Sequence, residues 1–221
     1  MVERSVEFGK GAEKGGAEAE RLLLRMLTIA FLIVAGCAFG GLGAGARAVA
    51  VENAAGVAED EENLRYFTDL PVVTHEGEEV RFYSDLLKNK RIIISYFYVN
   101  CPTAQPSLMT MFKMQKKLGD KLGSEVVLLS ISVDPERDTL EAVRGYAQKY
   151  NPRKGWYFVT GKPENLDVIN KKLGNTLRLP EGHLRQFLLG STRTNHWMRL
   201  VETAPLLALE DGLRTLEPVR E

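Results

Sequence analysis

The sequence predicts a three-layer α/β fold, in which helices cover both faces of a central sheet. Two continuous apolar runs support this prediction, RIIISYFYV at 91–99 and VVLLSISV at 126–133. Runs of this length that are rich in β-branched residues are typical of strands buried on both faces. A segment with apolar residues at helical spacing follows each run, and this alternation of strands and helices is typical of layered α/β proteins.

Local patterns define the remaining elements. Two short alternating segments flank a Glu76-Gly77 turn and predict an N-terminal β-hairpin at 71–75 and 79–82. Helical spacing of apolar residues predicts helices at 107–122, 138–150, 163–173 and 203–216. Further strands are expected at 156–159, 185–189 and 197–201. A cysteine-bearing loop between the first central strand and its helix completes the thioredoxin plan, with the N-terminal hairpin added.

Composition narrows the functional classes. The 29 basic and 29 acidic side chains balance, which argues against nucleic acid as the main partner because phosphate binding needs a basic surplus. The 44% of apolar residues is ordinary for a globular protein. Two cysteines, Cys37 and Cys101, exclude a disulfide-stapled mini-domain. The histidines are His75, His183 and His196, so a metal site with His or Cys ligands draws on a short list.

The N-terminal region has the pattern of a targeting segment. Residues 1–21 lack large apolar side chains, apart from Val2, Val6 and Phe8, and are expected to be a disordered extension. Residues 22–50 carry an apolar block preceded by arginines, which is typical of a secretory signal or an anchor. Residues 51–62 are small and acidic and are expected to form a linker, so 63–221 remains as one domain with its own core.

Three fates of the 22–50 segment stay open. The sequence at 34–37 resembles a lipoprotein box, which would place a lipid on Cys37. Ala48-Val49-Ala50 resembles a cleavage site, which would release the domain after Ala50. The stretch 22–46 could also remain as an uncut transmembrane anchor. Each fate places the domain outside the cytoplasm, on the periplasmic side, either tethered to the membrane or secreted.

Four stretches of the chain resemble the SCO/SenC family, the thioredoxin-fold copper metallochaperones of cytochrome c oxidase assembly. They are YFYVNCPTA at 96–104, SISVDPERDT at 130–139, WYFVTG at 156–161 and Gly182-His183 followed by 184–190. The resemblance covers about residues 66–217. It implies a thioredoxin-like fold, copper as Cu(I), and a cytochrome c oxidase subunit or another copper protein as the partner.

The resemblance also implies which residues would bind the metal. The family's C-x-x-x-C-P loop and histidine match Cys101, Pro106 and His183, but Gln105 stands at the second cysteine. Soft sulfur ligands select Cu(I), and a carboxamide cannot replace a thiolate or form a disulfide. The implied metal site therefore has a single cysteine and rests on Cys101 and His183.

Three methionines follow the loop, Met109, Met111 and Met114. The helical pattern places Met111 in the core and Met114 at its edge. Met109, in the first helical turn, lies on a different side of the helix from these core positions. It is therefore a candidate third ligand through its thioether. His196 and His75 are weaker candidates, since each lies near a hairpin end.

Two acidic residues flank the turn after the second central strand. Asp134 ends that strand and is a candidate for metal delivery or partner docking. Asp138 has Glu141 three residues later, and this spacing predicts a helix N-cap with a capping box.

Three functions remain open on these residues. The first is a membrane-tethered, extracytoplasmic SCO-like protein that handles copper through a degenerate single-Cys site. The second is a one-Cys thiol oxidoreductase or peroxidase, in which Gln105 orients the peroxide and an external thiol resolves Cys101. The third is a scaffold that kept the fold and lost the chemistry. A homodimer that pools two Cys101 thiolates would restore a two-sulfur site.

Overall fold

The structure is a computed structural model that describes residues 60–101, 106–176, 182 and 185–217. The expectations for the 1–21 extension, for the 22–50 segment with Cys37 and Ala50, and for 51–59 lie outside the described residues. Within these ranges, no helix is long and apolar enough to cross a membrane.

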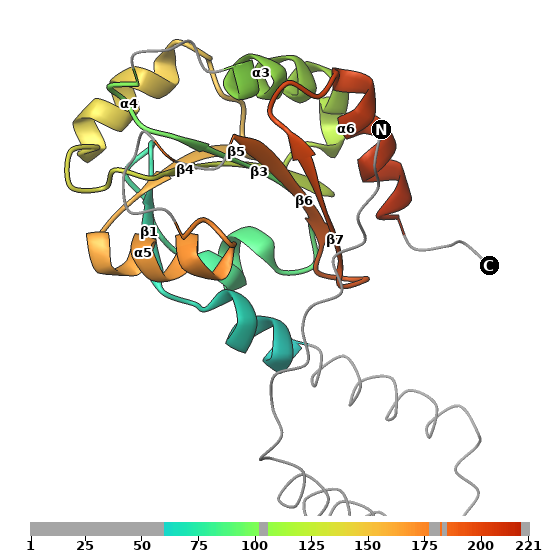
Figure 1. Cartoon of the computed structure of the whole chain (residues 1–221), viewed down its shortest axis with the longest axis horizontal. Coiled ribbons are helices and arrows are strands. Elements are labelled where there is room, and N and C mark those ends of the chain that lie inside the picture. The colour runs from blue at the N-terminus through green and yellow to red at the C-terminus, as the bar shows by residue number, and fades with distance from the viewer. Residues whose placement is uncertain (1–59, 102–105, 177–181, 183–184, 218–221) are drawn as a thin grey trace, which may run out of the picture. The chain divides into compact units, whose positions relative to one another are not determined.

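One seven-stranded mixed sheet forms the centre of the domain, with strand order β2-β1-β5-β4-β3-β6-β7 (Figure 1). The strands are β1 Pro71–Thr74, β2 Glu79–Arg81, β3 Arg91–Phe97, β4 Val126–Ser132, β5 Trp156–Thr160, β6 Gln186–Ser191 and β7 His196–Val201. β3, β4 and β5 pair in parallel, and the other neighbours pair in antiparallel register. The carboxyl ends of the three parallel strands therefore meet at one edge of the sheet.

Helices cover both faces of the sheet, as the sequence predicts (Figure 1). The first face carries α3 Pro106–Leu118, α4 Leu140–Gln148 and α6 Leu206–Thr215. The second face carries α5 Pro163–Lys172, the π-helical segment η1 Phe82–Leu87 and a helical segment at 60–67.

The two central strands are buried at every position because each face meets a helical layer. Ile93 and Phe97 of β3 belong to the core on the α3 side, and Ile92, Ile94 and Tyr96 belong to the core on the α5 side. This alternation is the two-residue period of a strand, and it explains why apolar residues occupy most positions of both runs.

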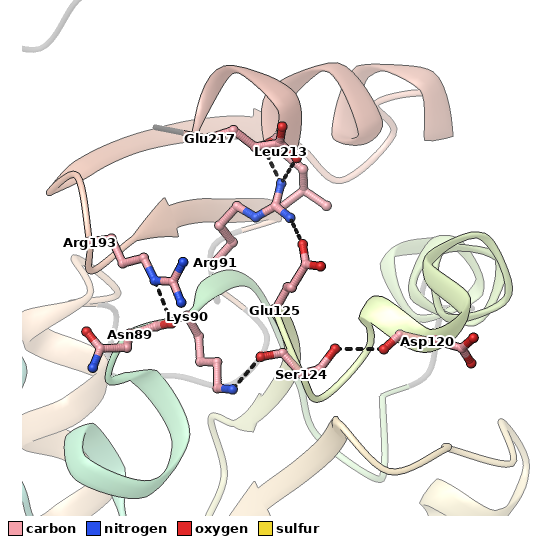
Figure 2. A network of polar contacts seen from close by, with 9 residues as sticks. All are labelled: Asn89, Lys90, Arg91, Asp120, Ser124, Glu125, Arg193, Leu213 and Glu217. Carbon is pink, nitrogen blue, oxygen red and sulfur yellow. Dashed lines mark hydrogen bonds and ion pairs between the residues drawn. The ribbon is translucent and has the colours of Figure 1, made fainter. Parts of the chain in front are cut away.

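A network of charged side chains lies at the opposite edge of the sheet, at the amino end of β3 (Figure 2). The Arg91 guanidinium donates to the Leu213 carbonyl at 3.1 Å and to Glu217 at 2.6 Å, and it reaches Glu125 at 2.8 Å. Arg91 is only 8% exposed. The network therefore joins β3, the start of β4 and the C-terminal end of α6.

The structure also contains elements that the sequence patterns did not predict. η1 and the helix at 60–67 are both new, and the latter includes residues 60–62 of the expected linker. That helix ends at Thr68, whose φ of 67° is unusual for a β-branched residue and whose N–H bonds the Leu64 carbonyl. α3 ends at Leu118, four residues earlier than expected, because Gly119 has a φ of 53° and leads into a short 3₁₀ turn at Gly119–Lys121.

Candidate functional site

Cys101 lies just beyond the carboxyl end of β3 and five residues before α3 begins. Cys101 is half-buried, and its backbone N–H donates to the Tyr98 carbonyl at 3.2 Å. It is the one cysteine among the described residues. The buried strand β3 ends shortly before Cys101, so Cys101 lies near the sheet edge where the parallel strands end.

Asp138 connects the ends of the three parallel strands by hydrogen bonds, one of which holds the backbone that leads into Cys101. Its carboxylate accepts from the Val99 N–H at 3.0 Å and from the Ser132 hydroxyl at 2.6 Å. Its backbone carbonyl accepts from the Thr160 hydroxyl at 2.7 Å, and its N–H donates to the Asp134 carbonyl. Asp138 is 1% exposed, so it fixes the backbone two residues before Cys101 from within the protein.

The prediction that Asp138 is a helix N-cap is wrong. The N-cap of α4 is Thr139, whose hydroxyl accepts from the Ala142 N–H at 3.3 Å. The Asp138 carboxylate points back to the strand ends instead, because the Val99 N–H and the Ser132 hydroxyl both need an acceptor there. Burial raises the pKa of Asp138 above its ordinary value, and the hydrogen bonds from Ser132 and Val99 oppose that rise.

Asp134 lies at the same edge and is engaged within its own turn. Its carboxylate pairs with Arg137 at 3.2 Å, and its backbone N–H donates to the Ser132 hydroxyl at 3.1 Å. Asp134 is mostly buried. Its expected role in metal delivery or docking is not tested by these contacts.

The three methionines divide between core and surface. Met111 and Met114 are fully buried on the α3 side of the sheet, so Met111 lies in the core as predicted and Met114 lies deeper than the edge position expected. Met109 is 50% exposed in the first turn of α3. Its thioether is therefore available to a ligand on the side of the helix that leaves the core.

The other candidate ligands are placed as follows. Gln105 and His183 lie outside the described residues. His196 begins β7 and is exposed. His75 is half-buried, its ring accepts from the Phe158 N–H at 3.4 Å, and burial lowers its pKa, all of which favours a structural role.

The donor set that the described residues offer to a metal is small. Among the residues that the structure describes, no group of three or more His, Cys, Asp or Glu side chains could hold a metal ion. Cys101 supplies a thiolate and Met109 a thioether, and both are soft ligands of the kind that suits Cu(I).

One buried aromatic side chain of α4 packs against the end of β3. Tyr146 of α4 stacks on Phe97, with ring centroids 5.6 Å apart and planes at 7°. Its hydroxyl lies 3.5 Å from that of Tyr150, and burial raises the pKa of Tyr146. The apolar spacing that predicts a helix at 138–150 includes Tyr146, but it does not predict the stack on Phe97.

Fold and site together define an α/β protein with a single half-buried cysteine where its first central strand leads into a helix. The SCO1/SenC family model matches residues 59–182, which is more than half of the 221-residue chain. The chain belongs to the SCO1/SenC family. The match ends one residue before His183, so it includes Cys101, Met109 and Asp138.

Named relatives agree with this family. The chain is 33% identical over 84 residues to the mitochondrial SCO1 homolog 1 of Arabidopsis thaliana, a match of 38% of this chain and 25% of that protein. The matches span between a quarter and about half of the length of the first two curated relatives.

Solved structures confirm the thioredoxin-like α/β fold. BsSco, described as a member of the Sco family of cytochrome c oxidase assembly proteins, superimposes with a TM-score of 0.57 at 24% identity, covering 68% of this chain and 92% of that one. Copper-bound ScoI of Arabidopsis thaliana gives a TM-score of 0.52 at 22% identity, covering 66% and 94%. At these identities the likeness shows the fold alone.

Proposed function

We propose that this protein handles copper in cytochrome c oxidase assembly and carries Cu(I) as cargo on a site with a single thiolate. Family membership supports the class of function, and solved relatives are described as copper-bound and as oxidase assembly proteins. The observation that carries the proposal is the position of Cys101, half-buried beyond β3 and anchored through Val99 to Asp138.

The donor chemistry fits the cargo. Cys101 supplies one thiolate, the resemblance assigns an imidazole to His183, and the exposed Met109 offers a thioether. Two sulfur donors and one nitrogen suit a soft Cu(I) ion. Gln105 removes the second thiolate and with it an intraloop disulfide, so the proposed role is to carry and transfer copper and not to act as a dithiol reductant.

The site is tested by anaerobic competition for Cu(I) between the full-length chain and a chelator of known affinity. Cys37 is the only other thiol in the sequence, so Cys37→Ser is the matched control. We expect tight binding in the parent and in Cys37→Ser, and its loss in Cys101→Ser and in His183→Ala. One copper per two chains would indicate that a homodimer shares the site. Binding by Cys101→Ser as tight as that of the parent would remove the proposal and leave the scaffold role.

The proposed location is extracytoplasmic, with the 22–50 segment as the tether. Its apolar block and preceding arginines support this location. Fractionation of cells that express the parent and Cys37→Ser tests it. Release of only the variant from the membrane indicates a lipid on Cys37, retention of both indicates a transmembrane anchor, and a secreted parent indicates cleavage near Ala50. Recovery of an uncleaved parent from the cytoplasm would contradict the proposal.

A further inference from the structure

Ser132, the last residue of β4, is held from both faces of the sheet. It pairs with Phe97 at the end of β3, and the next N–H along the chain, that of Val133, donates to the Phe97 carbonyl at 2.9 Å. On the α4 side, its hydroxyl donates to Asp138 at 2.6 Å. On the α5 side, its carbonyl accepts from the side-chain amide of Asn170 at 3.1 Å. Ser132 is fully buried, so these bonds determine where the strand ends.

Asn170 reaches Ser132 from a firmly packed helix. It lies in α5, whose Leu166 and Ile169 belong to the core on that side of the sheet. Asn170 is itself buried, and its Nδ2 must be the atom that faces the Ser132 carbonyl, because only the NH₂ end of the amide can donate. Through this one side chain, α5 holds the end of β4.

The other end of the Asn170 amide is unpaired. Within the part of the chain that the structure describes, its Oδ1 is buried and has no hydrogen-bond partner. An unpaired buried acceptor costs free energy, which offsets what the bond to Ser132 contributes to stability. Stability alone is therefore a weak reason for an asparagine at this position. What the side chain provides is a fixed location for the Ser132 carbonyl.

Ser132 is connected to the cysteine loop through Asp138. One carboxylate oxygen of Asp138 accepts from the Ser132 hydroxyl, and the other accepts from the Val99 N–H at 3.0 Å. Val99 lies two residues before Cys101. Three hydrogen bonds therefore lead from α5 to the backbone that carries the cysteine.

We infer that Asn170 is a positioning residue of the Cys101 site, which acts through Ser132 and Asp138 on the backbone before the cysteine. This inference rests on the proposed function, since it concerns the site assigned to Cu(I). Loss of an outer hydrogen-bond partner of a metal site weakens metal binding by about 10- to 100-fold. We expect about tenfold for Asn170→Ala, at the low end of this range, because Asn170 acts through two other residues.

Asn165 offers a matched control on the same helix. It is buried to a similar degree, and its Nδ2 donates to the Pro71 carbonyl at 2.9 Å. Pro71 belongs to β1, which β5 and β4 separate from β3 in the sheet. Asn165→Ala removes the same kind of bond, so it should lower the urea midpoint of unfolding at least as much as Asn170→Ala does.

The test combines two measurements on the full-length Cys37→Ser chain. The first is hydrogen–deuterium exchange at the Val99 amide without copper, and the second is anaerobic Cu(I) competition. Asn170→Ala should accelerate the exchange at Val99 several-fold and weaken Cu(I) binding about tenfold, and Asn165→Ala should change neither. Equal effects of the two variants, or unchanged exchange at Val99 in Asn170→Ala, would overturn the inference.

A double-mutant cycle tests the connection through Ser132. Ser132→Ala removes the hydroxyl that binds Asp138 and keeps the carbonyl that Asn170 binds. Exchange at Val99 should therefore accelerate in Ser132→Ala. Adding Asn170→Ala should accelerate it little further, because the connection to Asp138 is already broken. Unchanged exchange in Ser132→Ala, or fully additive effects of the two substitutions, would overturn the inference.

The two measurements separate this inference from the proposed function. Faster exchange at Val99 in Asn170→Ala, with no tight Cu(I) binding by the parent, would sustain the positioning of the cysteine backbone and remove the copper role. Tight Cu(I) binding by the parent, with exchange at Val99 unchanged in Asn170→Ala, would sustain the copper role and remove the inference.

Discussion

The carboxylate of Asp138 accepts a hydrogen bond from the backbone N–H of Val99, 39 residues earlier in the chain, at 3.0 Å. This bond joins the start of α4 to the segment that leads from β3 into Cys101. Because Asp138 also binds Ser132 at the end of β4, one buried side chain determines how two parallel strands end beside the site.

Removal of this carboxylate should destabilise the domain. Asp138→Ala leaves the Val99 N–H and the Ser132 hydroxyl without their acceptor, and we expect a loss of about 2–3 kcal/mol in the free energy of unfolding. Urea denaturation measures it. Thr139→Ala, which removes the α4 N-cap next to it, should cost only about 1 kcal/mol. Equal costs for the two variants would contradict the role assigned to Asp138.

The same residue gives the stability of the domain a pH dependence of known sign. Because burial raises the pKa of Asp138, the native state retains its proton at pH values where the unfolded chain has lost it. The part of the Asp138 contribution that depends on this proton is therefore fully present below the unfolded pKa of about 3.9 and is lost as pH rises through the folded pKa.

The side chain of the Asp138→Asn variant cannot ionise, so the stability of this variant does not show that loss as pH rises. The stability of the parent minus that of Asp138→Asn should fall as pH rises from about 4 to 7. Thermal unfolding in a buffer series measures the difference. A difference that stays constant or increases with pH would show that the folded pKa is not raised.

The Arg91 network should contribute to stability through burial of its guanidinium (Figure 2). Arg91→Met removes the bonds to Leu213, Glu217 and Glu125, and we expect a loss of about 1–3 kcal/mol, since both glutamates are partly exposed. Denaturant unfolding measures it. Arg214→Met is the control, because its ion pair with Asp211 is exposed and should contribute less than about 0.5 kcal/mol. A comparable loss in both variants would contradict the assignment.

The methionines of α3 should separate stability from copper binding. Met111→Ala should cost about 2–5 kcal/mol, because Met111 is fully buried. Met109→Ala should leave the unfolding free energy within about 0.5 kcal/mol and weaken Cu(I) binding. Unfolding curves and Cu(I) competition on both variants provide the comparison. Unchanged copper affinity in Met109→Ala would remove Met109 from the ligand set.

Patterns within one segment predicted the fold well and predicted contacts between segments poorly. The apolar runs predict β3 and β4 because burial on both faces leaves few polar positions in either strand. The D-x-x-E spacing that begins at Asp138 fits a capping box, but it fits equally well a buried carboxylate that binds the ends of strands. Only the folded structure brings the Val99 N–H to this carboxylate. The run at 91–99 includes Arg91 but does not predict its network, because the partners Glu125 and Glu217 lie 34 and 126 residues away.

The site shows the same division between local and distant information. Cys101 was found because its loop joins a recognisable strand to a recognisable helix. The stack of Tyr146 on Phe97 joins α4 to the end of β3, and no periodicity in the sequence predicts a contact between these two segments. Met109 was separated from Met111 by helical phase alone, and their exposures of 50% and 0% follow that phase.

X-ray absorption at the copper edge tests the single-thiolate site most directly. The sample is the Cu(I)-loaded, full-length Cys37→Ser chain, with Cys37→Ser/Met109→Ala for comparison. We predict one thiolate sulfur and one nitrogen at the metal, with a second sulfur that is lost in the Met109→Ala chain. A copper bound only by nitrogen and oxygen, or a second sulfur that persists after Met109→Ala at one copper per chain, would contradict the account.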